Sequence, residues 1–365
     1  MRTRPIFPPP APHPWPELSA DIADMNWMWL EEAAHFAADN EVPWPRDLKL
    51  HLESGYFEPP PHNEILGPIR PRGEPNGLVI RGGYTVVTWG DPQQVDFTFS
   101  AAKSYLSMLA GIAVMDGLIA DLDEPVRRTV DDGGFEGNHN GAITWRHLLQ
   151  NTSEWEGTLF GKSDLIDRNR NLSVEGQGRK GDPRPLHPPG THWEYNDVRI
   201  NQLSLALLHL FNEPLPEVFQ REILKPLGAG EGFAWRGYDN AWVELPARNG
   251  QPAKRVQSVP GGTHWGAGVS ISTLDQARIA QMLLDGGRAQ GQQLLPGDWV
   301  RAMTQPCPLA PFYGMLTWLN PNGTNFPGTS AASWFMVGAG GNYVWIEPEH
   351  QAVVVVRWLD SEHFA

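Results

Sequence analysis

The sequence of 365 residues contains one cysteine, Cys307. A single cysteine cannot form an intrachain disulfide, and one chain cannot build a thiolate metal cluster from it. Cys307 is therefore predicted to be a small apolar residue of the interior. Long apolar runs are also missing. Because no stretch of about 18 apolar residues occurs, no transmembrane helix and no membrane partner are expected.

Basic residues are fewer than acidic ones, and the sequence shows no typical export signal. The formal net charge is −14, so the chain should repel phosphate backbones, and nucleic acid is not an expected partner. Prolines interrupt every apolar run near the N-terminus, which argues against a signal peptide and makes a cytoplasmic location the expectation. With 41% hydrophobic and 19% charged residues, the chain is long and apolar enough to fold around a core.

The signatures of several catalytic classes are absent. The segment Gly268-Val-Ser-Ile-Ser272 lacks the last glycine of the Gly-x-Ser-x-Gly turn of α/β-hydrolases. No His-Glu-x-x-His or His-x-His pattern, phosphate-binding loop or dinucleotide fingerprint occurs. The sequence therefore predicts neither a metal site nor a cofactor.

Hydrophobic patterning predicts a mixed α+β protein. Strand hairpins are expected around Arg81-Gly82-Gly83 and around a Pro-Glu-His turn before the C-terminus. Helices are expected over 27–38, from near Ser100 to 120, over 143–153 and 197–211, and from Ser272 or Thr273 to Gly286, with a loop over 160–190. We expect one unit, 1–365. In it an antiparallel sheet from 1–99 and 260–365 forms an α/β lobe, and 100–259 forms an inserted, mainly helical lobe.

The first chemical motif is Ser100-Ala-Ala-Lys103, the only Ser-x-x-Lys that we find at the start of a buried helix. Residues three apart share a helix face, so hydroxyl and amine can meet. Burial and the helix N-terminus both disfavour an ammonium, which predicts a neutral lysine able to activate a serine nucleophile. The alternative is an N-cap serine beside a lysine that reaches towards solvent.

The second motif is Glu-Tyr195-Asn-Asp197 at the entry to the helix 197–211. A tyrosine held there can act as an acid–base group, although it could equally pack on the helix end. Tyr238, in a Tyr-Asp-Asn segment that is typical of a turn, is a weaker candidate.

The third motif is Gly338-Ala339-Gly340-Gly341 at the start of a strand. Glycines allow a backbone N–H to approach a substrate carbonyl. The Ala339 N–H, together with the Ser100 N–H, would form an oxyanion hole, with Gly338 and Gly340 lining the substrate site. A bulge or turn is the alternative explanation.

In this order, the motifs resemble the serine β-lactamase, penicillin-binding protein and family VIII esterase superfamily, and more strongly 6-aminohexanoate-dimer hydrolases and related carboxylesterases. The likeness extends from about Gly77 to Trp358. It is supported by the segments ITWRHLLQNTS, PPGTHWEYND and SISTLDQARIAQMLL. The resemblance implies a β-lactamase/transpeptidase-like fold and a catalytic group of Ser100, Lys103 and Tyr195.

Two departures from the family pattern bear on the substrate. Asp197 stands where the tyrosine motif usually ends in asparagine, and the third motif lacks the usual lysine or histidine. A β-lactam carboxylate would need such a cation, so a small ester or linear amide is the expected substrate. Asp197 and His264 are candidate substrate-binding residues. The alternatives are a β-lactamase or D-alanyl-D-alanine peptidase, or a catalytically silent binding protein of the same fold.

Overall fold

The structure is a computed structural model that describes residues 17, 19, 23–170, 179–248, 250 and 252–364. Its helices are α1 (Trp27–Asp39), α2 (Leu48–Glu53), α3 (Ala102–Met115), α4 (Trp145–Leu149), α5 (Asp197–Phe211), α6 (Leu215–Phe219), α7 (Thr273–Leu284) and α8 (Gly297–Met303). Its strands are β1 (Asn76–Arg81), β2 (Tyr84–Trp89), β3 (Val95–Phe97), β4 (Thr158–Leu159), β5 (Lys162–Ser163), β6 (Ala234–Arg236), β7 (Trp242–Leu245), β8 (Lys254–Gln257), β9 (Gly268–Ser272), β10 (Arg288–Ala289), β11 (Gln292–Gln293), β12 (Trp318–Leu319), β13 (Trp334–Gly338), β14 (Asn342–Glu347) and β15 (Ala352–Arg357).

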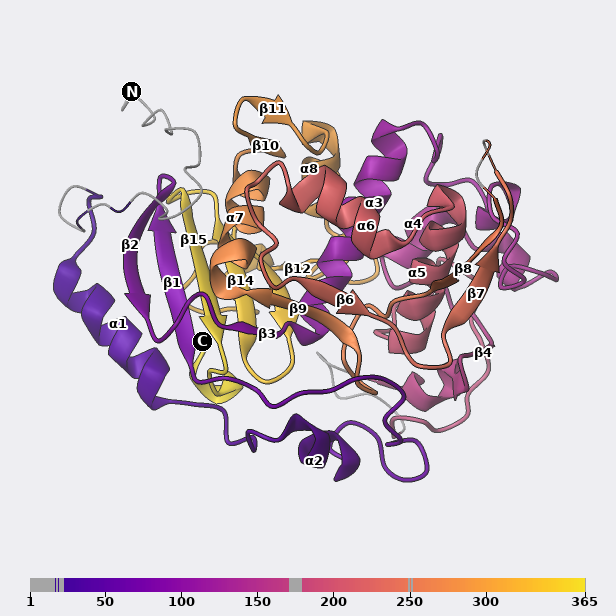
Figure 1. Cartoon of the computed structure of the whole chain (residues 1–365), viewed down its shortest axis with the longest axis horizontal. Coiled ribbons are helices and arrows are strands. Elements are labelled where there is room, and N and C mark those ends of the chain that lie inside the picture. Colours follow the sequence, from indigo (N-terminus) through magenta and orange to yellow (C-terminus); the bar gives the residue numbers. More distant parts are fainter. Residues whose placement is uncertain are drawn as a thin grey trace.

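The largest sheet combines strands from both ends of the chain. Its six strands lie in the order β12-β13-β14-β15-β1-β2, and each neighbouring pair is antiparallel. The last strand lies between β14 and β1, with Ala352 opposite Arg81 and Arg357 opposite Asn76. Figure 1 shows this sheet with the N-terminal and C-terminal colours side by side.

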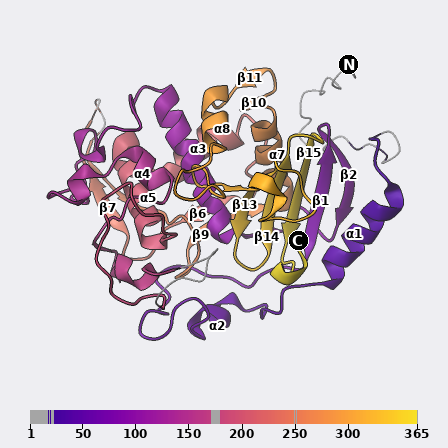
Figure 2. The same cartoon turned by 180° about the vertical axis from the view of Figure 1, so that it is seen from behind.

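Helices cover both faces of the sheet because its side chains alternate between them. Val79 packs with Leu30 of α1 on one face. Its neighbours Leu78 and Ile80 belong to the main core on the other face, where α7 lies against β1, β14 and β15. In both views, α1 flanks the sheet on the side away from the helical part of the molecule (Figures 1 and 2).

Helix α3 runs through the core and carries Lys103 near its N-terminus. Twelve of its 14 residues are buried, including Lys103 and Ser104. It packs against α5 and α6 of the helical region and also contacts β13 of the sheet. The helix therefore lies between α5 and α6 on one side and the sheet on the other, and the turn that precedes it contacts β13.

The α+β class and the antiparallel sheet flanked by helices are confirmed. Helix α5 covers the predicted 197–211, and both predicted hairpins are present. The loop over 160–190 is only partly correct, since it contains β5 and a 3-10 turn, Asp164–Asp167; its residues 171–178 lie outside the described part. The division into two lobes stays a prediction. Among the described residues, no helix has both the length and the apolar character needed to cross a bilayer.

Candidate active site

Ser100 lies in a 3-10 turn, Phe99–Ala101, that leads directly into α3. Its side chain is half-buried, whereas Lys103 is 1% exposed. The Lys103 Nζ atom donates a hydrogen bond to Ser100 Oγ over 2.9 Å. The predicted contact between the two ends of the Ser-x-x-Lys motif is therefore present.

The backbone before Ser100 is strained. Phe99 has a φ of 48°, a region that a bulky L-residue rarely adopts. Its ring is enclosed by Trp44, Phe57 and Trp358, with ring centroids 5.6 to 6.1 Å apart. Strain of this kind persists only where the surroundings fix it, so this aromatic packing determines the direction in which Ser100 points.

The end of β13 runs beside the same turn. A Cβ atom on Gly338 would lie 2.0 Å from the Thr98 carbonyl oxygen, so only glycine permits this approach. The next residue, Ala339, is half-buried, and its carbonyl accepts a hydrogen bond from the Asn342 side chain over 2.7 Å. The Ala339 N–H thus belongs to a fixed segment beside the serine, and its oxyanion-hole role stays a prediction.

Gly340 faces the aromatic core. A Cβ atom there would lie 2.8 Å from Trp44 and 2.9 Å from Trp358. Close packing against these two indoles, together with a φ of 76°, explains the glycine. Its predicted contact with substrate stays a prediction.

The expectation of a neutral or proton-sharing Lys103 stays a prediction, and the structure places an ionic partner beside its amine. The Lys103 ammonium forms an ion pair with Asp197, and both side chains are buried. Burial alone would lower the pKa of Lys103, but the adjacent carboxylate outweighs it, and the pKa is raised above its usual value. Burial opposes ionisation of Asp197 too, yet Lys103 and Arg170 hold its pKa well below the usual range.

Asp197 is the centre of a buried charge network. Its second carboxylate oxygen accepts a hydrogen bond from Arg170 and lies 3.1 Å from His264 Nδ1. Its backbone N–H donates to Asp167 over 2.8 Å, and Arg170 also lies 3.4 Å from Asp167. Asp197 is therefore fixed by contacts from both its side chain and its backbone.

Tyr195 lies next to the two cations of this network. Its ring centroid is 4.8 Å from Lys103 Nζ and 5.0 Å from the Arg170 guanidinium carbon. The described part of the chain offers its hydroxyl no hydrogen bond. Tyr238, the weaker candidate, is not a surface turn residue: it is buried, and its hydroxyl accepts a hydrogen bond from Asn201 over 3.2 Å. Of the two tyrosines, the structure places Tyr195 beside Lys103.

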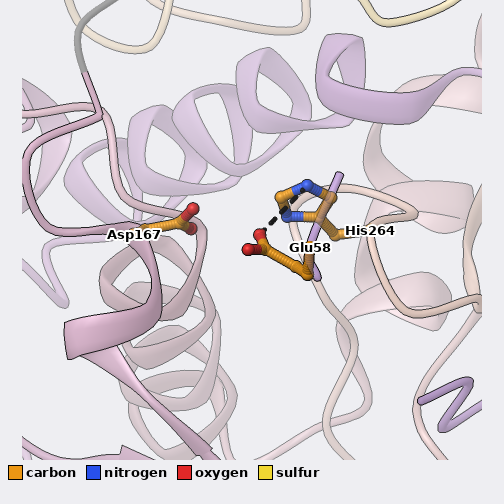
Figure 3. A group of neighbouring side chains, drawn as sticks. All are labelled: Glu58, Asp167 and His264. Carbon is orange, nitrogen blue, oxygen red and sulfur yellow. Dashed lines mark ion pairs between the residues drawn. The ribbon is translucent and has the colours of Figure 1, made fainter. Parts of the chain in front are cut away.

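His264 is buried and connects Asp197 with the N-terminal region. Its Nε2 atom lies 3.5 Å from Glu58, whose carboxyl group also forms an ion pair with Lys180. Lys180 lies 3.0 Å from Asp167. Figure 3 shows the Glu58 carboxyl group between the His264 ring and Asp167.

By distance alone, Glu58, Asp167 and His264 could hold a metal ion, because their ligand atoms lie within 4.8 Å of one another. The Lys180 ammonium, however, contacts both carboxylates. It therefore supplies the positive charge that a metal ion would bring, and we assign no metal to this group.

Four members of this network were not predicted from the sequence: Glu58, Asp167, Arg170 and Lys180. Glu58 lies in a proline-rich segment, and the other three fall in the expected loop. Charged residues in such segments are usually exposed. The run Asp-Arg-Asn-Arg at 167–170 is the only local signal of a charge cluster.

Aromatic side chains continue from Tyr195 away from the network. Tyr195 lies 5.7 Å from Trp318 and 6.2 Å from Tyr313, ring centroid to ring centroid. Trp193 and Phe312 extend the group, 5.1 Å apart. We call these five residues the aromatic cluster. Trp193, Phe312 and Trp318 are only partly buried, so the cluster reaches the surface on one side.

An antiparallel sheet, a buried helix and a serine–lysine pair at the start of that helix define the β-lactamase-like class of hydrolases. A family model described as Beta-lactamase matches residues 78–358. The chain therefore belongs to the Beta-lactamase family. No curated protein matches it in sequence.

Solved structures share the fold at low sequence identity. A protein described as a 6-aminohexanoate-dimer hydrolase from Bacillus anthracis is 14% identical, with a TM-score of 0.57, covering 95% of this chain and 82% of its own. EstCE1, described as a hydrolase with promiscuous acyltransferase activity, is 17% identical, with a TM-score of 0.57 and coverages of 93% and 95%. A penicillin-binding protein homologue from Caulobacter crescentus is 16% identical, with a TM-score of 0.55 and coverages of 86% and 91%.

Proposed function

We propose that this protein is a serine hydrolase that cleaves a small ester or linear amide through an acyl-enzyme on Ser100. The observation that carries the proposal is the 2.9 Å hydrogen bond between Lys103 Nζ and Ser100 Oγ at the start of a buried helix. A buried lysine is costly unless it has a partner, and here it contacts both a hydroxyl group and the Asp197 carboxylate. This arrangement suits proton transfer from a nucleophile.

In the proposed reaction, Ser100 Oγ attacks the substrate carbonyl carbon. Lys103 can accept the serine proton only in its amine form, so its ammonium must first release a proton to solvent, while Asp197 stays ionised. The backbone N–H groups of Ser100 and Ala339 would stabilise the oxyanion. As the tetrahedral intermediate collapses, the leaving oxygen or nitrogen takes the proton back by way of Lys103 and Tyr195. A water molecule then attacks the acyl-enzyme carbonyl and gives its proton to the same residues. The Ser100 oxygen leaves and takes a proton back, which releases the acyl group as an acid.

The charges around Ser100 favour a neutral substrate. Arg170 forms ion pairs with Asp197 and Asp167, and Lys180 forms ion pairs with Glu58 and Asp167. A substrate carboxylate would have to displace one of these partners or stay unpaired, which is costly in a desolvated site. The aromatic cluster beside Tyr195 provides apolar surface suited to an uncharged acyl or leaving group.

The test compares three substrates on one preparation: p-nitrophenyl butyrate, a linear anilide and a chromogenic cephalosporin. We expect kcat/KM to be highest for the ester or the anilide. A cephalosporin value equal to or above both would favour a β-lactamase instead.

A fluorophosphonate probe separates an enzyme from a silent binding protein. Wild-type protein should be labelled at one serine, and Ser100→Ala should be neither labelled nor active while keeping its circular dichroism spectrum. Labelling of the alanine variant, or activity within about tenfold of wild type, a barrier change of only about 1.4 kcal/mol, would exclude Ser100 as the nucleophile.

A further inference from the structure

We propose that Glu58 is a positioning residue of the active site: it shares one proton with His264 and so holds Asp197 in place against Lys103. The inference rests on the proposed function, because it concerns the proton path of that reaction. Glu58 precedes residue 78, where the family match begins. The proposal therefore adds a segment outside the family match to the active site.

The segment around Glu58 is fixed on the loop that carries His264. The His62 carbonyl accepts hydrogen bonds from Trp265 Nε1 over 2.8 Å and from Lys162 Nζ over 3.1 Å. The Leu66 N–H donates to the Trp265 carbonyl over 2.8 Å. The position of Glu58 is therefore set by the fold.

Two further contacts fix Phe57, the residue that precedes Glu58. The Phe57 ring lies edge-on to the His264 ring, with centroids 4.6 Å apart. The Phe57 carbonyl accepts a hydrogen bond from Lys180 Nζ over 3.1 Å. Glu58 itself is 2% exposed. A buried carboxyl group 3.5 Å from an imidazole nitrogen is placed to influence where the imidazole carries its proton.

The surroundings of His264 decide which nitrogen must carry a proton. Nδ1 lies 3.1 Å from Asp197, whose carboxylate is kept ionised by Lys103 and Arg170. A carboxylate can only accept hydrogen bonds, so Nδ1 must be protonated to contact it favourably. The exchangeable proton is therefore the one on Nε2 or on Glu58; the two groups lie 3.5 Å apart without an aligned hydrogen bond in this structure.

The neighbouring charges place this exchange near neutral pH. Burial and the charge of Asp167 raise the pKa of Glu58 to about 7, while Lys180 and Arg170 oppose the rise. Burial lowers the pKa of His264, and the carboxylates of Asp197 and Asp167 oppose that change.

Two further charges complete the surroundings. Lys162 lies close enough for the charge of Glu58 to act on its pKa, and Lys103 faces the far side of Asp197. No ion pair joins either lysine to Glu58 or His264 among the described residues.

The direction of the pH effect follows from this arrangement. When pH rises through about 7, the shared proton leaves, and the Glu58 carboxylate then faces a lone pair on Nε2. His264 can relieve that repulsion by moving its remaining proton to Nε2 or by turning its ring. Either change removes the N–H that Nδ1 donates to Asp197. Asp197 is then held less firmly against Lys103, and kcat falls.

The experiment compares kcat and KM for the ester in wild type, Glu58→Gln and Glu58→Ala from about pH 6 to about pH 9. In wild type, kcat should fall about tenfold with a midpoint near 7. Glutamine can accept from Lys180 and donate to His264 Nε2 at every pH. Glu58→Gln should therefore stay within about threefold of wild-type kcat at low pH and lose the fall. Glu58→Ala should have a lower kcat throughout, with KM little changed.

The matched control is Glu53→Gln, which changes an exposed carboxylate of α2 in the same N-terminal segment. It should keep the wild-type pH profile. A double variant, Glu58→Gln with His264→Asn, tests the coupling: once His264 is replaced, the Glu58 change should have no further effect on the profile.

The outcomes separate this inference from the proposed function. If wild type neither turns over any substrate of the panel nor reacts with the fluorophosphonate, the proposed function fails. If wild type is active but Glu58→Gln keeps the same midpoint near 7, the role of Glu58 is refuted and the hydrolase proposal stands. Thermal melting of each variant shows whether it folds. If only Glu58→Ala is unstable, the profile of Glu58→Gln still decides.

Discussion

The Asp197 carboxylate forms a buried ion pair with the Lys103 ammonium, three residues after the proposed nucleophile. Asparagine is the usual residue at this position in the resembled superfamily. An amide would leave Lys103 without a counter-ion, and burial would then favour the neutral amine. The carboxylate reverses that preference, so the amine form of Lys103 that can accept the serine proton has to form against this ion pair.

Replacing Lys103 separates its charge from its ability to transfer a proton. Lys103→Arg should keep an ion pair with Asp197 but lose about 10²-fold to 10⁴-fold in kcat, because a guanidinium does not give up its proton at accessible pH. Lys103→Ala should be equally inactive and also less stable, by about 3 to 5 kcal/mol, since it leaves a buried carboxylate short of one partner. Steady-state kinetics and urea unfolding measure both effects. An active arginine variant would reduce Lys103 to an electrostatic support.

The two candidate tyrosines can be distinguished by removing each hydroxyl group. Tyr195→Phe should lose about 10²-fold to 10⁴-fold in kcat, the usual contribution of a general acid or base. Tyr238→Phe should change kcat by less than about tenfold and cost about 1 kcal/mol of stability, because it loses only the hydrogen bond with Asn201. If the effects on kcat are exchanged, Tyr238 replaces Tyr195 in the mechanism.

Two adjacent glycines should respond differently to an added methyl group. A Cβ atom on Gly262 would lie 3.4 Å from Lys103 Nζ and 3.6 Å from Ser100 Oγ, which is ordinary van der Waals contact. Gly262→Ala should therefore fold normally but lower kcat/KM by about tenfold or more, because the methyl group occupies space beside the nucleophile.

The matched control for Gly262→Ala is Gly261→Ala, whose Cβ would lie 2.5 Å from the Ile200 side chain. This overpacking should cost about 1 to 3 kcal/mol of stability. Equal melting temperatures for the two variants would contradict the placement of this loop.

The lowered pKa of Glu154 predicts that the stability of the fold decreases in acid. Burial would raise its pKa, but hydrogen bonds from Arg184 and the charge of Arg199 outweigh burial and lower the pKa to about 2. An acid whose folded pKa is depressed stabilises the protein above its unfolded pKa, and that stability is lost as pH falls. The free energy of unfolding should therefore decrease from about pH 4.5 towards about pH 2.

Urea unfolding at several pH values tests this, with Glu154→Gln compared with the exposed Glu31→Gln. The Glu154 variant should be less stable at neutral pH and less sensitive to acid. An unchanged acid dependence in that variant would show that other groups cause the loss.

Local patterns were sufficient for much of the fold and for the contact between Ser100 and Lys103. Helix α5 begins directly after Asn196, whose side chain accepts hydrogen bonds from two backbone N–H groups of the first turn. Ser100 and Lys103 meet because three residues correspond to nearly one helical turn. Such features depend on neighbours in the sequence, so a sequence pattern contains them.

The charge network could not be predicted in this way. Glu58, Asp167 and Lys180 are brought together only by the folded chain, and nothing near them in sequence indicates burial. The ion pair of Lys103 could not be predicted for the same reason, since its partner Asp197 lies 94 residues away. Burial of a charge depends on its partners in three dimensions.

The position of β15 inside the sheet has a consequence for biosynthesis. Because β15 lies between β14 and β1, residues 76–81 have no final partner on that side until residues 352–357 have left the ribosome. The nascent chain must carry β1 and the apolar α3 for most of translation without a completed sheet. Contacts so distant in sequence form slowly, and exposed strand edges invite aggregation. The insertion of β15 between β14 and β1 is therefore the step at which chaperones would matter most, and a variant that lacks β15 should not complete the sheet.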